Sequence, residues 1–116
     1  MTISHNDLIE ALAAARPVVV VDVRERQEQA TLYMGGINLP AARLTRAEYM
    51  DQLAPYAALQ NVLFVCVCNH ARGQRAPYAA GLLQTKGYNA VVLEGGMYAG
   101  WSKYQKKRTI PLPLIP

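Results

Sequence analysis

The residue in this sequence best suited to chemistry is a cysteine that ends a short apolar segment. Cys68 closes the run 62–68 and is followed by a polar, glycine-containing stretch that leads to Arg75. A side chain at the end of a buried strand faces the mouth of the sheet, where a following turn and helix aim backbone N–H groups at it. Helix N-termini and cations such as Arg72 and Arg75 lower a cysteine pKa from about 8.5 to roughly 3.5 to 7.5. The pattern predicts that Cys68 is a nucleophile and a thiolate near pH 7.

The stretch after the cysteine also predicts an anion-binding loop. Gly73 permits unusual backbone angles, and successive N–H groups in a turn form a concave site for an anion. The nucleophile and the anion site would then coincide. The residues assigned to this loop are Asn69, His70, Ala71, Arg72, Gly73, Gln74 and Arg75.

The two cysteines also have simpler interpretations. Cys66 lies inside the apolar run and is predicted to be a small buried hydrophobe, which is the alternative for Cys68 as well.

The cysteines also bear on metal binding and on the redox compartment. Cys66, Cys68 and His70 lack a fourth ligand, so we expect no metal site. Two cysteines separated by one residue cannot link distant segments, which favours a reducing compartment and, by default, the cytoplasm.

Buried strands and helices alternate along the chain. Continuous apolar runs predict strands over 18–23, 62–68 and 90–93. Apolar spacing and capping signals predict helices over about 6–15, after Thr45, and over 75–86. This order predicts an α/β domain with a small open, mostly parallel sheet flanked by helices on both faces.

The strand ends bring further polar residues toward the cysteine. In open sheets of this class ligands bind beyond the carboxyl ends of the strands, where Asp22, Arg24 and Cys68 are expected to gather. The 116 residues, 52% of them hydrophobic, fit one domain over 1–116. The proline-rich segment 109–116 is predicted to be an extended tail.

Composition argues against two classes of partner. The net charge of +4 comes largely from a basic cluster near the C-terminus that lacks interleaved stacking aromatics, so we expect no nucleic-acid binding. The apolar runs are too short to span a bilayer, and the N-terminus has no basic start followed by an apolar core. We therefore expect a cytoplasmic protein without a membrane partner.

Three segments in the right order resemble those of the rhodanese-like domain family. Residues 19–25 resemble its strand ending in Asp-Val-Arg, 36–40 resemble its Gly-Ala-Ile-Asn-Ile-Pro segment, and 93–101 resemble its Gly-Gly-x-x-x-Trp signature. The resemblance covers a core of about 17–104 and implies a single-domain sulfurtransferase without cofactor or metal. It implies that Cys68 takes sulfane sulfur from thiosulfate or a persulfide donor and passes it to cyanide or a thiol, with other proteins among the donors and acceptors. It also implies that Asp22 and Arg24 brace the loop.

The length of the loop departs from that family and leaves alternatives open. Residues 69–74 separate Cys68 from Arg75, two more than in the common pattern. The loop is longer, or the cysteine is displaced and His70 stands in its place, or Arg72 keeps the loop short and the extra residues join the helix. Related phosphatases and arsenate reductases use a loop one residue longer, because a tetrahedral oxyanion needs a wider ring of N–H groups. A phosphatase or arsenate reductase, and a catalytically silent binding module, are therefore the alternative functions.

Overall fold

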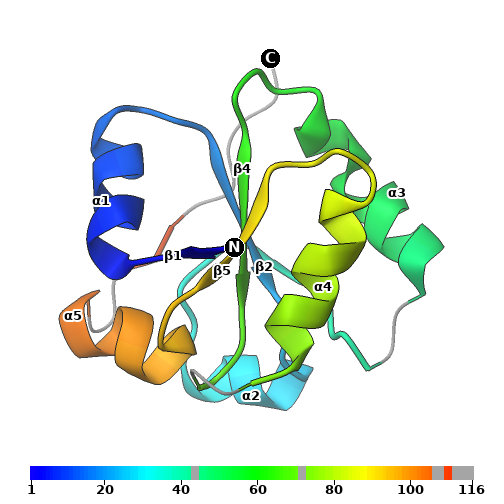
Figure 1. The fold of residues 1–116 in the computed structure, drawn as a ribbon. Coiled ribbons are helices and arrows are strands. Elements are labelled where there is room, and N and C mark those ends of the chain that lie inside the picture. The colour runs from blue at the N-terminus through cyan, green and yellow to red at the C-terminus, as the bar shows by residue number, and fades with distance from the viewer. Residues whose placement is uncertain (43–44, 71–72, 106–108, 111–116) are drawn as a thin grey trace.

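The structure is a computed structural model that describes residues 1–42, 45–70, 73–105 and 109–110. Helices and strands alternate along the chain (Figure 1). The elements are β1 (Thr2–Ile3), α1 (His5–Ala13), β2 (Val18–Asp22), α2 (Arg26–Thr31), β3 (Ile37–Asn38), α3 (Arg46–Ala57), β4 (Leu63–Val67), α4 (Arg75–Gln84), β5 (Ala90–Leu93), the π-helix η1 (Gly96–Ser102) and α5 (Lys103–Gln105).

The centre of the domain is a five-stranded sheet in the order β1-β5-β4-β2-β3, in which all pairs are parallel. The predicted parallel α/β sheet is therefore confirmed. β2 and β4 are neighbours, with Asp22 opposite Val67. The end of β2 thus lies beside the residue that precedes Cys68, as the strand-end argument expects.

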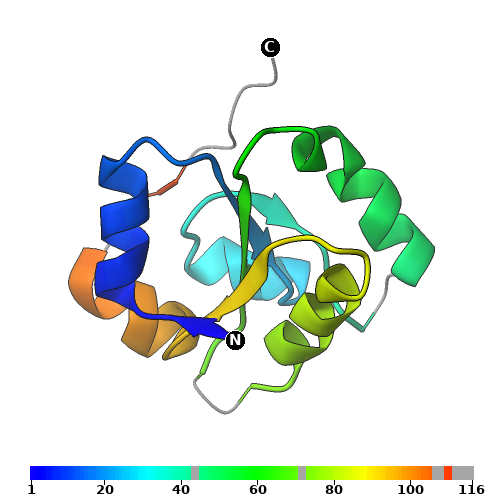
Figure 2. The ribbon, with the colours of Figure 1, turned by 45° about the horizontal axis from the view of Figure 1, so that its top comes forward.

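Helices cover both faces of the sheet, as predicted. Figures 1 and 2 show α3 and α4 on one side and α1, η1 and α5 on the other. Alternate residues of β2 and β4 supply the two cores. Val19, Phe64 and Cys66 belong to the core that contains Leu53 of α3 and Leu83 of α4. Val20 and Val65 belong to the core with Leu8, Met97 and Trp101.

Local signals in the sequence explain where the longer helices begin and end. The Ser4 hydroxyl accepts a hydrogen bond from the Asp7 N–H at 3.1 Å and caps α1. Thr45 and Glu48 form the predicted capping box before α3, each side chain accepting a hydrogen bond from the other residue's N–H. Gly87, soon after the last turn of α4, has a φ of +81°, which a glycine adopts at little cost.

The described structure extends beyond the expected core of 17–104. β1 pairs with β5, and Leu8 of α1 is fully buried, so the N-terminal residues belong to the domain. Ile110 is buried and its N–H donates to the Met34 carbonyl. The rest of the predicted tail, 111–116, lies outside the described residues. No helix in the described part of the chain has the length and apolar character needed to cross a membrane.

Gly36 precedes β3 at a position that excludes a side chain. Its φ is +82°, and a Cβ there would lie 2.2 Å from the Val20 carbonyl oxygen. We predict that Gly36→Ala lowers the free energy of unfolding by at least about 2 kcal/mol, because backbone strain and a clash with a central strand add. Denaturant titration followed by circular dichroism measures this change.

Gly81 provides the matched control for that substitution. It lies inside α4, and a Cβ added to it would meet nothing within 4 Å, so Gly81→Ala is expected to stabilise the protein by up to about 1 kcal/mol. Equal stabilities of the two variants would contradict the role assigned to Gly36.

Candidate active site

Cys68 directly follows β4 and faces the first turn of α4. Its Sγ accepts a hydrogen bond from the backbone N–H of Ala76 at 2.8 Å. The side chain of Cys68 is only 3% exposed. The structure thus brings the cysteine to the N-terminus of a ten-residue helix, where N–H groups are available to a negative charge on sulfur.

The environment of Cys68 differs from the sequence-based expectation in its effect on the thiol. Burial raises the pKa of Cys68, and the N–H of Ala76 and the charge and hydrogen bonds of Arg75 lower it only in part. The direction of this shift is opposite to the lowered pKa expected from the sequence. The physical reason is that desolvation of the charged form outweighs the helix N-terminus and the cation.

The loop folds back onto the sulfur at Gly73. A Cβ at this position would lie 2.9 Å from Sγ of Cys68, and the Gly73 N–H donates to the His70 carbonyl at 3.1 Å. Gln74 is the N-cap and α4 begins at Arg75. The extra residues therefore belong to the loop and not to the helix. Ala71 and Arg72, the remaining members of the predicted loop, lie outside the described residues.

His70 lies on the rim of the site and not in the place of the nucleophile. It is exposed, and its ring stacks on Tyr98 of η1 with 5.7 Å between the ring centroids. Cys68, in contrast, contacts the helix N-terminus. This geometry argues against a displaced cysteine whose place His70 has taken.

The first residues of η1 support the start of the loop from the other side. The Met97 N–H donates to the Cys68 carbonyl at 2.7 Å, and the Tyr98 N–H donates to the Asn69 carbonyl at 3.2 Å. Gly96 has a φ of +64°, and a Cβ on it would lie 2.7 Å from the Cys68 carbonyl oxygen. The two backbones can approach this closely because Gly96 has no side chain.

Arg24 connects the end of β2 to the loop. Its guanidinium is fully buried and pairs with the buried carboxylate of Asp22 through two hydrogen bonds of 2.9 and 2.8 Å. It also donates to the side-chain oxygen of Asn69 at 3.0 Å and to the Leu32 carbonyl. These are contacts that hold the first loop residue against the sheet.

Glu28 of α2 is a site residue that the sequence reasoning missed. Its carboxylate accepts hydrogen bonds from Arg75 at 2.6 and 3.1 Å and from the side-chain amide of Asn69. These bonds, chiefly those from Arg75, lower its pKa to about 2. Glu25 and Glu28 form a capping box, and this signal could have predicted a helix at the carboxyl edge of the sheet, beside the loop.

Cys66 takes no part in this arrangement. It is fully buried, and burial raises its pKa to about 12, so it is inert as a nucleophile. The described residues contain no group of three His, Cys, Asp or Glu side chains placed to hold a metal ion.

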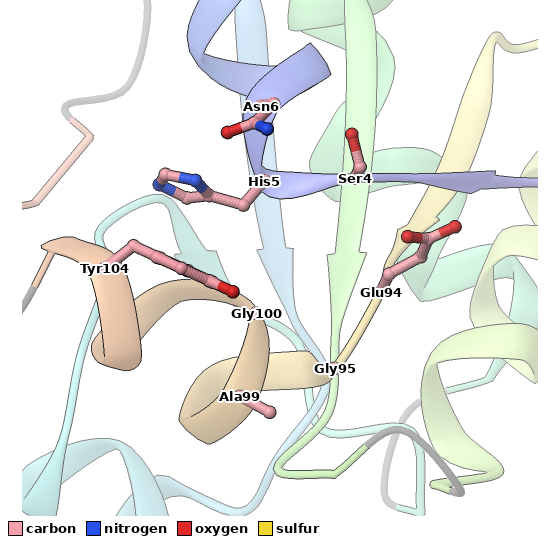
Figure 3. Close-up of a pocket in the computed structure, with 8 residues that line it drawn as sticks. All are labelled: Ser4, His5, Asn6, Glu94, Gly95, Ala99, Gly100 and Tyr104. Atoms are coloured by element: carbon pink, nitrogen blue, oxygen red, sulfur yellow. The ribbon is translucent and has the colours of Figure 1, made fainter.

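Two hollows lie near the carboxyl ends of the strands. One, of about 310 Å³, lies between the start of α1 and the Gly95 turn (Figure 3); its lining includes His5, Glu94 and Tyr104 and excludes Cys68. A smaller hollow of about 210 Å³ is lined by Ala41, Ala42, Gln74, Arg75 and Tyr78. The second hollow shares Arg75 with the site around Cys68.

Comparisons with known proteins agree with this architecture. The family model named Rhodanese-like domain matches residues 4–103, whereas comparison with curated proteins gives no match. A rhodanese-like domain protein from Staphylococcus aureus is similar in structure, with 28% identity, a TM-score of 0.63, and coverage of 87% of this chain and 92% of that chain.

Two further solved structures, both under 25% identical, share the fold. A thiosulfate sulfurtransferase from Pseudomonas aeruginosa has 20% identity and a TM-score of 0.71, and the match covers 99% of this chain but 22% of that chain. An As/Sb reductase from Leishmania major has 23% identity and a TM-score of 0.70, with coverage of 89% and 77%. With the family model matching most of its length, this chain belongs to the rhodanese-like domain family.

Proposed function

We propose that this protein is a rhodanese-type sulfurtransferase in which Cys68 carries sulfane sulfur as a persulfide. The observation that supports this most directly is the hydrogen bond of 2.8 Å from the Ala76 N–H to Sγ, at the start of α4. An N–H group at a helix N-terminus stabilises negative charge on the sulfur. Arg75, the first residue of the same helix, adds a positive charge beside Cys68.

The proposed transfer takes two displacement steps. The thiolate of Cys68 attacks the outer sulfur of thiosulfate; a bond forms between Sγ and that sulfur, and sulfite leaves with the electron pair of the broken S–S bond. A thiolate or cyanide then attacks the outer sulfur, and the electron pair of the second broken bond returns to Sγ. The balance requires no external oxidant, reductant or cofactor.

The burial of Cys68 has two consequences for this mechanism. Because Cys68 is almost fully buried and the backbone at Gly73 lies close to Sγ, we propose that a sulfur donor reaches Sγ when the loop moves. In the closed arrangement, the persulfide is shielded from water and from unrelated thiols. Shielding of this kind suits a carrier that holds sulfur between two reactions.

The proposed partners follow from this chemistry. The sulfur donor is thiosulfate or a persulfide, and the acceptor is a thiol or cyanide, with other proteins as candidates for both. Cys66 and Cys68 are free, which suits the reducing cytoplasm proposed as the site of action.

The length of the loop favours a second candidate function, oxyanion chemistry as in a phosphatase or arsenate reductase. α4 begins at Arg75, so the described residues 69, 70, 73 and 74 all precede the helix. A longer loop offers a wider ring of N–H groups. Two contacts argue against this candidate. The backbone at Gly73 lies close to Sγ of Cys68, and Arg75 already donates hydrogen bonds to the carboxylate of Glu28. The third candidate, a silent binding module, is favoured by the burial and raised pKa of Cys68.

We predict that thiosulfate adds the mass of one sulfur atom to the protein and that cyanide removes it, because Cys68 forms a persulfide. Intact mass spectrometry before and after each reagent measures this. Cys68→Ser is expected to abolish the adduct. Cys66→Ala is the matched control and is expected to retain it, because Cys66 is fully buried. An adduct that survives Cys68→Ser would contradict the assignment.

The pH dependence of Cys68 alkylation follows from the direction of its pKa shift. Burial raises the pKa of Cys68, so the thiolate fraction rises at higher pH than for a free cysteine. We predict that the rate of iodoacetamide alkylation in Cys66→Ala protein has its midpoint above about pH 8.5. Alkylation quenched at set times and followed by mass spectrometry measures the rate, and a midpoint near pH 7 would show that desolvation does not dominate.

A third prediction separates sulfur transfer from oxyanion chemistry. We expect neither arsenate reduction in the presence of thiol nor hydrolysis of an aryl phosphate. In both reactions the arsenic or phosphorus atom has to reach Sγ together with its oxygens, where the backbone at Gly73 lies close to the sulfur, whereas thiosulfate presents only its outer sulfur. Turnover is measured by arsenite formation and by release of the phenol, with Cys68→Ser as the blank. Turnover of either substrate that depends on Cys68 would favour the second candidate function.

A further inference from the structure

Glu28 forms an ion pair with Arg75, the cation beside Cys68. The two side chains form a doubly hydrogen-bonded ion pair, with Nη1 of Arg75 2.6 Å from one carboxylate oxygen and Nη2 3.1 Å from the other. The pair is partly accessible, at 33% for Arg75 and 26% for Glu28. The guanidinium of Arg75 is therefore already paired with the Glu28 carboxylate when an anion approaches Cys68.

The carboxylate of Glu28 is fixed in place and ionised. The backbone N–H of Glu25 donates to it at 2.8 Å, and the side-chain amide of Asn69 donates to its other oxygen. Hydrogen bonds from Arg75 are the main reason that its pKa falls to about 2. Glu28 is thus negatively charged throughout the physiological range.

This arrangement distinguishes ligands by their charge. Repulsion between Glu28 and a bound anion is proportional to the charge of that anion, so a dianion is penalised about twice as much as a monoanion at the same place. Among the residues that the structure describes, the second cation near the loop is Arg24, which is buried against Asp22. Each of these two cations is therefore paired with a carboxylate.

We propose that Glu28 is a specificity-determining positioning residue that makes the site at Cys68 favour singly charged sulfane-sulfur donors, such as organic persulfides and thiosulfonates, over dianions such as thiosulfate. This inference rests on the proposed sulfurtransferase function. Glu28 contacts Arg75 and Asn69 and acts on a bound anion through its charge and through its pairing with Arg75.

A matched pair of sulfur donors tests the inference. Thiosulfate carries two negative charges and the methanethiosulfonate anion carries one, while both offer an outer sulfur bound to an oxidised sulfur. With methanethiosulfonate, the Cys68 thiolate bonds to the outer sulfur, the S–S bond of the reagent breaks, and methanesulfinate leaves with the electron pair. The products are the same Cys68 persulfide and a leaving anion in both cases.

The measurement is the ratio of persulfide formation rates with the two sulfur donors, followed by intact mass in single turnover. Because both reactions use the same Cys68 thiolate, any change in its pKa cancels in the ratio. In Glu28→Gln, the ratio of thiosulfate to methanethiosulfonate rates is expected to rise about three- to tenfold, the effect of one unit of charge at a separation of several ångströms.

Three variants separate charge from structure. Glu28→Asp keeps the charge and is expected to keep the wild-type ratio. Glu10→Gln removes the same charge from an exposed position on α1 and is expected to leave the ratio unchanged. If Glu28→Gln does not fold, as judged by circular dichroism, Glu28→Asn compared with Glu28→Asp repeats the test at shorter side-chain length.

The outcomes distinguish this inference from the proposed function. An unchanged ratio in Glu28→Gln, or the same change in Glu28→Asp, would overturn the role of Glu28 charge while leaving sulfur transfer intact. Failure of the wild-type protein to take sulfur from either reagent would overturn the sulfurtransferase proposal, and the inference with it.

Discussion

The arrangement of the site depends on one charge that has no access to solvent. The guanidinium of Arg24 is fully buried, and a buried cation is tolerated only when its charge and its N–H groups are all matched. Asp22 supplies the countercharge, while Asn69 and the carbonyl of Leu32 accept further hydrogen bonds. The end of β2, the chain after α2 and the start of the loop must therefore stay together, because separating any of them leaves an unmatched buried group.

A chain of hydrogen bonds runs from Arg24 through Asn69 and Glu28 to Arg75 and restricts the orientation of each side chain. The side-chain oxygen of Asn69 faces Arg24 and its nitrogen faces Glu28, so the orientation of the amide is fixed by its two neighbours. Glu28 then holds Arg75 at the start of α4. The same set of hydrogen bonds therefore positions Asp22 at the end of β2 and Arg75 at the start of α4. These two residues are far apart in the sequence.

The sequence predicts the parts of this protein whose signals are local. Apolar runs and capping residues identify β2, β4, β5, α1, α3 and α4, and the strand-end argument places Cys68 beside Asp22 and Arg24. β1 and β3 have only two residues each and carry no periodicity. The pairing of Glu28 with Arg75 and the desolvation of Cys68 depend on how the loop folds over the sheet edge, which no local pattern encodes.

The burial of Cys68 and its proposed chemistry are compatible because the cause that raises the pKa is reversible. Desolvation by burial is the largest contribution, and the backbone at Gly73 is among the groups that lie close to the sulfur. A movement that admits a substrate removes part of this desolvation, whereas the N–H of Ala76 belongs to α4 and stays in place. In the proposed mechanism, therefore, a movement that exposes the sulfur to a donor would also favour its thiolate.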